Sequence, residues 1–175
     1  MKRRMFSMVV VVTIAALLVG AFGAYALSPE EVKVILKVNE ERGRKGFNPL
    51  WHNAQLSAAA RRHSEDMATN DFFNHTGSDG SRFWERVNEA GYTGSPIGEY
   101  IGAGYTTAES WIEAIMALGQ TTPSYLQYLM HPLADRIGVG NQSLYWTLEL
   151  GRGGSIDKVT SGCALPGLGL LLLGD

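Results

Sequence analysis

Two side chains that suit acid–base chemistry, His75 and Glu99, lie in loop-like surroundings. Imidazole and carboxyl groups are frequent proton donors and acceptors in enzyme sites near neutral pH. His75 precedes a turn rich in Gly, Ser and Asp, and Glu99 lies between Gly98 and Tyr100. Because functional residues concentrate in such segments, we expect both side chains to line a cleft. The alternative is structural: His75 would cap the turn, and Glu99 would accept backbone N–H groups.

Other catalytic signals are missing from the sequence. It contains neither a Gly-x-Ser-x-Gly nucleophile elbow nor a His-Glu-x-x-His metal helix. The single cysteine, Cys163, lies in the C-terminal tail, without structured surroundings that would activate a thiolate. We therefore favour a protein that is not an enzyme, although His75 and Glu99 alone would support general acid–base catalysis.

The elements that must position His75 and Glu99 begin with helices. Capping patterns and hydrophobic periodicity predict four of them, over residues 28–43, 53–70 and 81–90 and from about residue 106 onward. In the second helix, His63 shares one stripe with Leu56, Ala60 and Met67. His63 is therefore expected to be a core histidine and not part of the chemistry.

Strands follow the helices along the chain. Two are expected over residues 136–140 and 143–151, the second because apolar and polar residues alternate strictly. Residues 94–104 are so rich in glycine that we interpret them as a loop with a short strand, and residues 119–132 as a loop or irregular helix. Helices followed by strands predict an α+β fold whose small antiparallel sheet is covered by helices.

The first 26 residues differ from the rest of the chain. A basic start at residues 2–4 is followed by an uncharged run from Met5 to Ala26, which ends in the small-x-small pattern Ala24-Tyr25-Ala26. This pattern predicts a signal peptide cleaved after Ala26. An uncleaved anchor that spans the membrane through residues 5–26 is the alternative. Both readings predict a secreted or extracellular protein, in the second case anchored at its N-terminus.

The remaining chain is acidic and has no disulfide of its own. Without residues 1–26, 12 of the 15 Lys and Arg residues remain against 17 Asp and Glu, a net charge of −5. Nucleic-acid binding needs a basic face, so we do not expect nucleic acid as a partner. A single cysteine cannot form an intramolecular disulfide, so the hydrophobic core must stabilise an exported domain by itself.

Several sequence blocks occur in an order typical of one known family. They are V-N-E-E-R-G-R-K-G-F-N-P-L at 38–50, His63 to Met67, Phe72 to Gly77, Arg86 with Ala90-Gly91-Tyr92, Gly98-Glu99, Ile137 to Gly140, and Tyr145-Trp146. Together they cover about residues 32 to 151. The chain resembles bacterial members of the CAP superfamily, whose module is also called the SCP domain. This resemblance implies an α-β-α sandwich.

The resemblance also implies a cleft that, in well-known members, two His and two Glu residues line and that can hold a divalent metal. His75 matches the first His. Glu99 matches the Glu of a Gly-Glu-Asn motif, in which Tyr100 here replaces Asn. Tyr125 occupies the position of the second His, and His131, nearby in sequence, is its candidate substitute. The second Glu cannot be placed, since Ile115-Met116 stands in that region.

These observations predict residues 28–151 as a CAP/SCP domain that acts as a non-catalytic binding or cell-envelope module, with His75, Glu99, Tyr125 and His131 lining its cleft. Its partner would be a small molecule, a lipid or a cell-envelope component. No cofactor is expected. One alternative is a metal-assisted, protease-like hydrolase that binds zinc through His75 and Glu99, and another is a lipid or sterol carrier. Residues 152–175 are interpreted as a poorly ordered tail, or as the remnant of a sorting signal.

Overall fold

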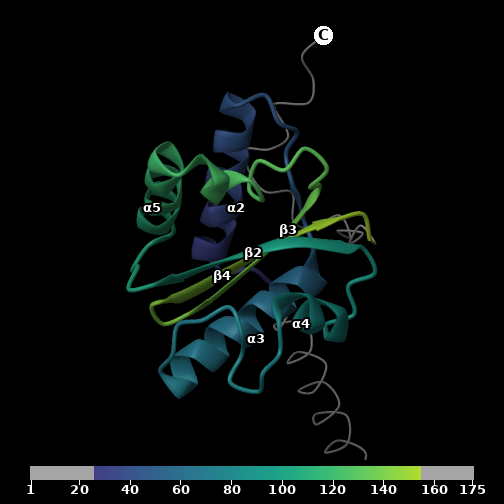
Figure 1. The fold of residues 1–175 in the computed structure, drawn as a ribbon, viewed down its shortest axis with the longest axis vertical. Helices are drawn as coiled ribbons and strands as arrows, with labels where there is room; N and C mark the ends of the chain where they lie inside the picture. Colours follow the sequence, from purple (N-terminus) through teal and green to yellow (C-terminus); the bar gives the residue numbers. More distant parts are fainter. Residues whose placement is uncertain (1–25, 155–175) are drawn as a thin grey trace, which may run out of the picture.

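A computed structural model describes residues 26–154 of the chain. In it a sheet lies between two helical layers (Figure 1). Helices α2 (Pro29–Arg44) and α5 (Ala108–Thr121) cover one face of the sheet, and helices α3 (Ala54–Asn70) and α4 (Phe83–Glu89) cover the other. The predicted α+β class and α-β-α sandwich are confirmed. The predicted signal segment apart from Ala26, and all but residues 152–154 of the predicted C-terminal tail, lie outside the described residues.

The sheet has four strands in the order β1-β3-β4-β2. Strands β2 (Ser95–Ala103), β3 (Arg136–Gln142) and β4 (Tyr145–Arg152) pair in antiparallel fashion, as expected from the sequence. The two-residue strand β1 (Trp51–His52) pairs with β3 in parallel, so the sheet is mixed. The sequence analysis did not predict β1, because two residues are too few to show an alternating pattern.

Caps at the helix ends follow from the sequence patterns. Ser28 accepts from the Glu31 backbone N–H, and the Glu31 side chain accepts from the Ser28 N–H, which completes the predicted capping box of α2. Asn53 caps α3 by accepting from the Leu56 N–H. Thr107 caps α5, and a 3₁₀ turn, η1 (Pro123–Leu126), follows that helix.

Strand β2 is longer than the glycine content of residues 94–104 indicated. It runs for nine residues, and two of its glycines are explained by aromatic rings that pack against them. A Cβ added at Gly98 would lie 2.5 Å from the Tyr128 ring, and one at Gly102 would lie 2.3 Å from the Trp111 ring. Glycine here makes room for packing, so the prediction of a loop with a short strand was wrong.

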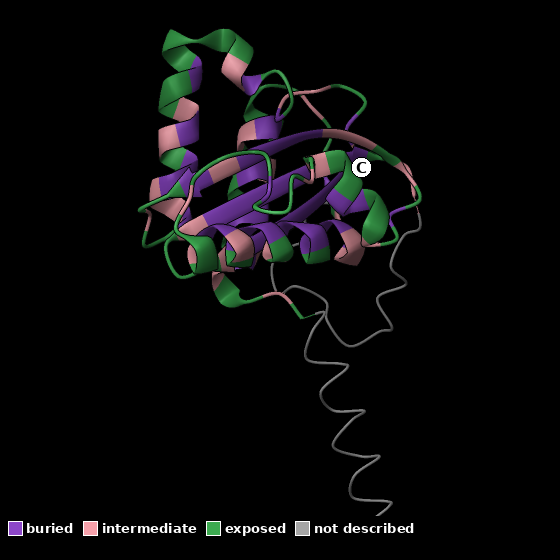
Figure 2. Cartoon of the chain, turned by 60° about the horizontal axis from the view of Figure 1, so that its bottom comes forward, coloured by how far each residue is buried: buried purple, intermediate pink, exposed green. Residues whose placement is uncertain are grey.

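The two faces of the sheet differ in chemistry. On the α2/α5 face, apolar side chains such as Ile137, Val139, Leu148 and Leu150 form the main core with Trp111. The opposite face carries Gly138, Gly140, Thr147 and Glu149, and helix α3 lies directly upon it. Both faces are buried (Figure 2). Polar groups on the α3 face therefore lie inside the protein.

Among the described residues, none of the helices has both the length and the apolar character needed to cross a membrane. Of the uncharged run at residues 5–26, only Ala26 belongs to the described residues.

The close approach of α3 to the sheet gives a testable prediction. A Cβ at Gly140 would lie 2.2 Å from the Arg61 backbone nitrogen, whereas a Cβ at Gly43 in α2 would meet nothing within 4 Å. Gly140→Ala should lower the free energy of unfolding by roughly 1–3 kcal/mol, since backbone atoms cannot move aside easily. Gly43→Ala, the control, should raise it by about 0.5–1 kcal/mol. Urea denaturation measures both, and equal effects would contradict the packing described.

Candidate active or binding site

His75 and Glu99, which are expected from the sequence to line one cleft, are in direct contact. His75 follows α3 in the loop that leads to α4, and Glu99 lies in the middle of β2. The Nδ1 atom of His75 lies 2.7 Å from Oε1 of Glu99. The His75 side chain is 63% exposed and that of Glu99 is 1% exposed, so the pair joins the protein surface to its interior.

Arg86, on α4, holds the other oxygen of Glu99. Its Nη2 donates to Glu99 Oε2 at 2.6 Å, and both side chains are 1% exposed. The same guanidinium donates to the backbone carbonyls of Ser81 at 2.7 Å and His75 at 3.1 Å. Arg86 therefore fixes the Glu99 carboxylate and both ends of the 75–81 loop at once.

Glu149, on β4, is a second buried acid in the site. It lies directly opposite Glu99 in the β2–β4 register and is fully buried. No N–H or hydroxyl group of the described residues donates to either Glu149 oxygen. Burial raises the pKa of Glu149 well above its usual value, and the charge of the facing Glu99 carboxylate raises it further. A protonated Glu149 can donate to Glu99, which two ionised carboxylates could not do.

Glu99 itself is the ionised member of this pair. Burial alone would raise the pKa of Glu99, but the hydrogen bond from His75 and the charge of Arg86 together hold it below its usual value. Since an ionised carboxylate only accepts hydrogen bonds, the proton of a neutral His75 ring lies on Nδ1. Its Nε2 atom is then a hydrogen-bond acceptor on an exposed ring.

His63 is a core histidine, as predicted. It is fully buried, and its Nε2 lies 2.9 Å from the Asn74 carbonyl, one residue before His75. Burial lowers the pKa of His63, while the charge of Glu99 opposes this effect and that of Arg86 reinforces it. His63 is therefore neutral, and its contact with the Asn74 carbonyl holds the backbone just before the 75–81 loop.

Tyr125 lies on the other side of β2 from the Glu99 carboxyl. Successive side chains of a strand point to opposite faces, so Tyr100 points away from Glu99. Tyr125 packs edge-on against the Tyr100 ring, with centroids 5.5 Å apart, and its carbonyl accepts from the Tyr100 hydroxyl. In the described residues, no hydrogen bond joins Tyr125 to His75 or Glu99.

His131 is likewise hydrogen-bonded on the α2 side of the sheet. Its carbonyl accepts from Arg42 on α2 at 3.3 Å, and its Nδ1 accepts from the Leu133 N–H at 3.2 Å. Within residues 26–154, His131 makes no hydrogen bond to the His75–Glu99 pair. The structure thus joins two of the four expected cleft residues in one contact, and a cleft shared by all four stays a prediction.

The donor set fits a zinc ion poorly. Zinc sites use three or four protein ligands from His, Cys and carboxylate groups. Among the described residues, no three such side chains are grouped so that they could hold a metal ion. Both oxygens of Glu99 already accept hydrogen bonds, and the cationic Arg86 lies 2.6 Å from one of them. His75 remains as one accessible ligand.

Arg86 and Glu149 are the site residues that were not predicted. Arg86 belongs to one of the family blocks, but its role depends on burial, which the sequence does not show. Glu149 is one of the polar residues that alternate in its strand, a pattern typical of a strand with one exposed face. Glu149 could have been identified from the helices predicted around its strand: if helices cover both faces of the sheet, a carboxyl in that strand must be buried.

The sequence of the chain matches one known family. Residues 35–143 match the sequence profile of the family described as CAP: Cysteine-rich secretory protein family. The chain belongs to this CAP family. It is 29% identical over 126 residues to YkwD of Bacillus subtilis (strain 168), and the match covers 71% of the chain and 48% of YkwD. The chain thus spans about half the length of that relative.

Solved structures support the CAP fold. An extracellular protein containing a SCP domain from Bacillus anthracis aligns with a TM-score of 0.66 at 19% identity, covering 73% of this chain and 45% of that one. An outer surface protein from Borrelia burgdorferi aligns with a TM-score of 0.60 at 18% identity, covering 73% and 96%. A cysteine-rich secretory protein from Staphylococcus aureus gives 0.58 at 17% identity, covering 71% and 38%. At these identities the likeness establishes the fold alone.

The buried acid pair of this CAP domain gives a second prediction. Glu149 has a raised pKa in the folded state, so its stabilising contribution is complete below the unfolded pKa of about 4.3 and is lost as pH rises towards the folded pKa. Glu149→Gln stays neutral and can still donate to Glu99. The unfolding free energy of wild type minus that of Glu149→Gln should therefore fall with rising pH, by at most about 1.4 kcal/mol per unit.

Urea denaturation between pH 4 and about 8 measures this difference, and other titrating groups largely cancel in it. Glu113→Gln, which replaces an exposed acid on α5, is the matched control because its carboxyl is not buried. A difference for Glu149→Gln that does not change with pH would show that Glu149 is ionised in the folded protein.

Proposed function

We propose that this CAP domain is an exported, non-catalytic module that binds a component of the cell envelope through the exposed ring of His75. The observation that carries the proposal is the double engagement of Glu99. His75 holds one carboxylate oxygen and the buried Arg86 holds the other. Glu99 therefore orients the site, and because its side chain is only 1% exposed it is out of reach of a substrate or metal.

The surroundings of His75 favour binding over catalysis. Glu99 orients the ring as an acid orients the general base of a catalytic triad, but a triad also needs a nucleophile beside the base. Within residues 26–154, no Ser, Thr or Cys side chain is hydrogen-bonded to His75. What the ring offers is an accessible Nε2 acceptor of fixed orientation, which suits the recognition of a hydroxyl or amide donor.

Export is part of the proposal and rests on two separate supports. The N-terminal sequence has the basic start, apolar run and small residues of a signal peptide, with a retained anchor as the alternative. Two structural relatives are described as an extracellular protein and an outer surface protein, which is stated of those proteins. An envelope partner follows from this location.

The two alternatives find less support. A metal-assisted hydrolase needs further ligands beside His75, and Glu99 is engaged by Arg86. A lipid carrier needs an apolar groove, whereas the cavity that lies beside Arg86 is lined by charged and polar side chains. Neither alternative has a specific observation in its favour.

The test uses two histidine variants of the full chain. His75→Ala should weaken co-sedimentation with isolated cell walls of Bacillus subtilis by about tenfold, the loss expected from one good hydrogen bond. His131→Ala is the matched control, because His131 lies on the α2 side of the sheet, and it should sediment as wild type does. Equal loss in both variants, or no sedimentation of the wild type, would contradict the proposal.

A further inference from the structure

Strand β2 lies at one edge of the sheet and pairs with β4 on its inner side alone. Gly104, just after the strand, donates its backbone N–H to the Leu144 carbonyl on that inner side. Because the backbone groups of successive residues in a strand point to opposite sides, Gly102 also faces β4. Ile101 and Ala103 therefore direct their backbone N–H and C=O groups outward, away from the sheet.

No other part of the described chain supplies partners for these outward groups. Within residues 26–154, nothing is hydrogen-bonded to the backbone of residues 99–103 except β4. In Figure 1 the helical layers lie above and below β2, against the faces of the sheet and not along its edge. Ile101 is half-buried and Ala103 is exposed, whereas Glu99 is buried. The open part of the edge thus begins just after Glu99.

The two halves of β2 differ in their protection from pairing with another strand. Natural edge strands are commonly guarded by proline, by bulges or by charged side chains. Pro96 and an irregular register between Pro96 and Gly98 guard the first half. After Gly98 the strand has no proline and no lysine, and its one charged side chain, Glu99, is turned inward to Arg86. The second half is therefore able to accept a further strand.

His75 lies at one end of this open stretch. Its ring is bonded to Glu99, which precedes Ile101 by two residues. Side chains two residues apart in a strand point to the same face, so Ile101 shares the face of Glu99 and His75. In an added antiparallel strand, the side chain opposite Glu99 would also lie on this face, beside the exposed ring of His75.

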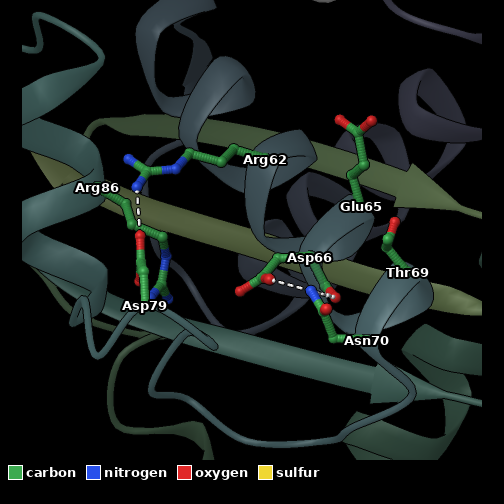
Figure 3. A pocket seen from close by; sticks show the side chains of 7 residues that line it. All are labelled: Arg62, Glu65, Asp66, Thr69, Asn70, Asp79 and Arg86. Atoms are coloured by element: carbon green, nitrogen blue, oxygen red, sulfur yellow. Dashed lines mark hydrogen bonds and ion pairs between the residues drawn. The ribbon is translucent and has the colours of Figure 1, made fainter.

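The hollow beside Arg86 is separate from this edge. Its lining side chains come from α3, from the turn before α4 and from α4, and none comes from β2 (Figure 3). Arg62 donates to Asp79 at 2.8 Å, and Asn70 donates to Asp66 at 2.8 Å. These groups satisfy one another and do not call for a ligand.

The geometry of the edge selects an extended peptide. Outward groups occur at every second residue, so they recur about every 6.8 Å, which is the repeat of another strand. A second copy of the chain suits the edge less well. The net charge of −5 without residues 1–26 makes two copies repel. The open stretch is also too short to supply the roughly 800 Å² per partner of a standard interface.

We propose that β2 binds an extended peptide as an added antiparallel strand. The peptide would place an apolar side chain opposite Ile101 and, two residues later, a hydrogen-bond donor that reaches Nε2 of His75. The inference rests on the proposed function for the role of His75, and it identifies the envelope component as a peptide. Antiparallel pairing is the more stable form per residue, and the main-chain hydrogen bonds supply the affinity.

Hydrogen exchange of the ¹⁵N-labelled full chain, followed by NMR, tests the edge. In the free protein, the amides of Ile101 and Ala103 should exchange at least about tenfold faster than those of Tyr100 and Gly102, which are bonded to β4. The probe is the acetylated and amidated heptapeptide Thr-Val-Thr-Ile-Thr-Asn-Thr. At saturation it should slow exchange at Ile101 and Ala103.

Two methylated forms of the peptide are the matched controls. A methyl group on the amide nitrogen of its isoleucine, which faces β2, should weaken binding by about fivefold, the loss expected from one hydrogen bond. The same methyl group on the next amide, which points to solvent, should leave binding unchanged. Ala103→Pro removes one outward N–H and should also weaken binding about fivefold, since proline is tolerated on an edge.

The role of His75 is tested with a second pair of peptides. His75→Ala should weaken binding of the asparagine peptide about fivefold, but not binding of a peptide with alanine in place of asparagine. Slow exchange at Ile101 in the free protein, no binding of the heptapeptide, or equal effects of the two methyl groups would overturn the proposal. Protection of Ile101 that grows with protein concentration alone would assign the edge to a second copy and also overturn it.

The edge proposal and the proposed function fail separately. Peptide binding that protects Ile101 and Ala103, without sedimentation on cell walls, would refute the envelope role alone. Sedimentation that is lost in His75→Ala but unchanged in Ala103→Pro, without peptide binding, would refute the pairing with β2 alone.

Discussion

The buried ion pair between Arg86 and Glu99 is the interaction on which the rest of this site depends. Both side chains are almost fully buried, and removing one partner of such a pair leaves an uncompensated charge inside the protein. The pair connects α4 to the central region of β2. Through the carbonyls of Ser81 and His75, the same guanidinium also fixes the loop that presents the histidine.

The pair also decides which acid carries a proton. Because Arg86 lies against Glu99, the negative charge is stabilised there, and the facing Glu149 remains neutral in a fully buried position. Two acids in register on neighbouring strands would repel each other if both were ionised. Their different environments remove this repulsion, because Glu99 alone carries the charge. The exposed residue of this site, His75, has its ring orientation fixed by the Glu99 carboxylate, whose side chain is 1% exposed.

The sequence predicted the helical elements and the core position of His63, and it indicated His75 and Glu99 as candidate cleft residues, because periodicity, caps and glycine-flanked loops are local signals. It did not predict Glu149, since the register that places it opposite Glu99 joins residues 50 positions apart. The length of β2 was also missed, because the need for glycine at 98 and 102 arises from aromatic rings contributed by distant segments. Tyr125 and His131 were expected beside His75 by alignment with a family pattern, whereas their contacts lie on the α2 side of the sheet.

We propose that Arg86 engages the buried Glu99 carboxylate, so that His75 has no partner ligand for a metal among residues 26–154. Thermal unfolding of the purified full chain during titration with zinc tests it most directly, because a ligand that binds only the folded state raises the melting temperature. The account predicts no rise that depends on His75. A rise of several degrees in the wild type and in His131→Ala, abolished by His75→Ala, would contradict it.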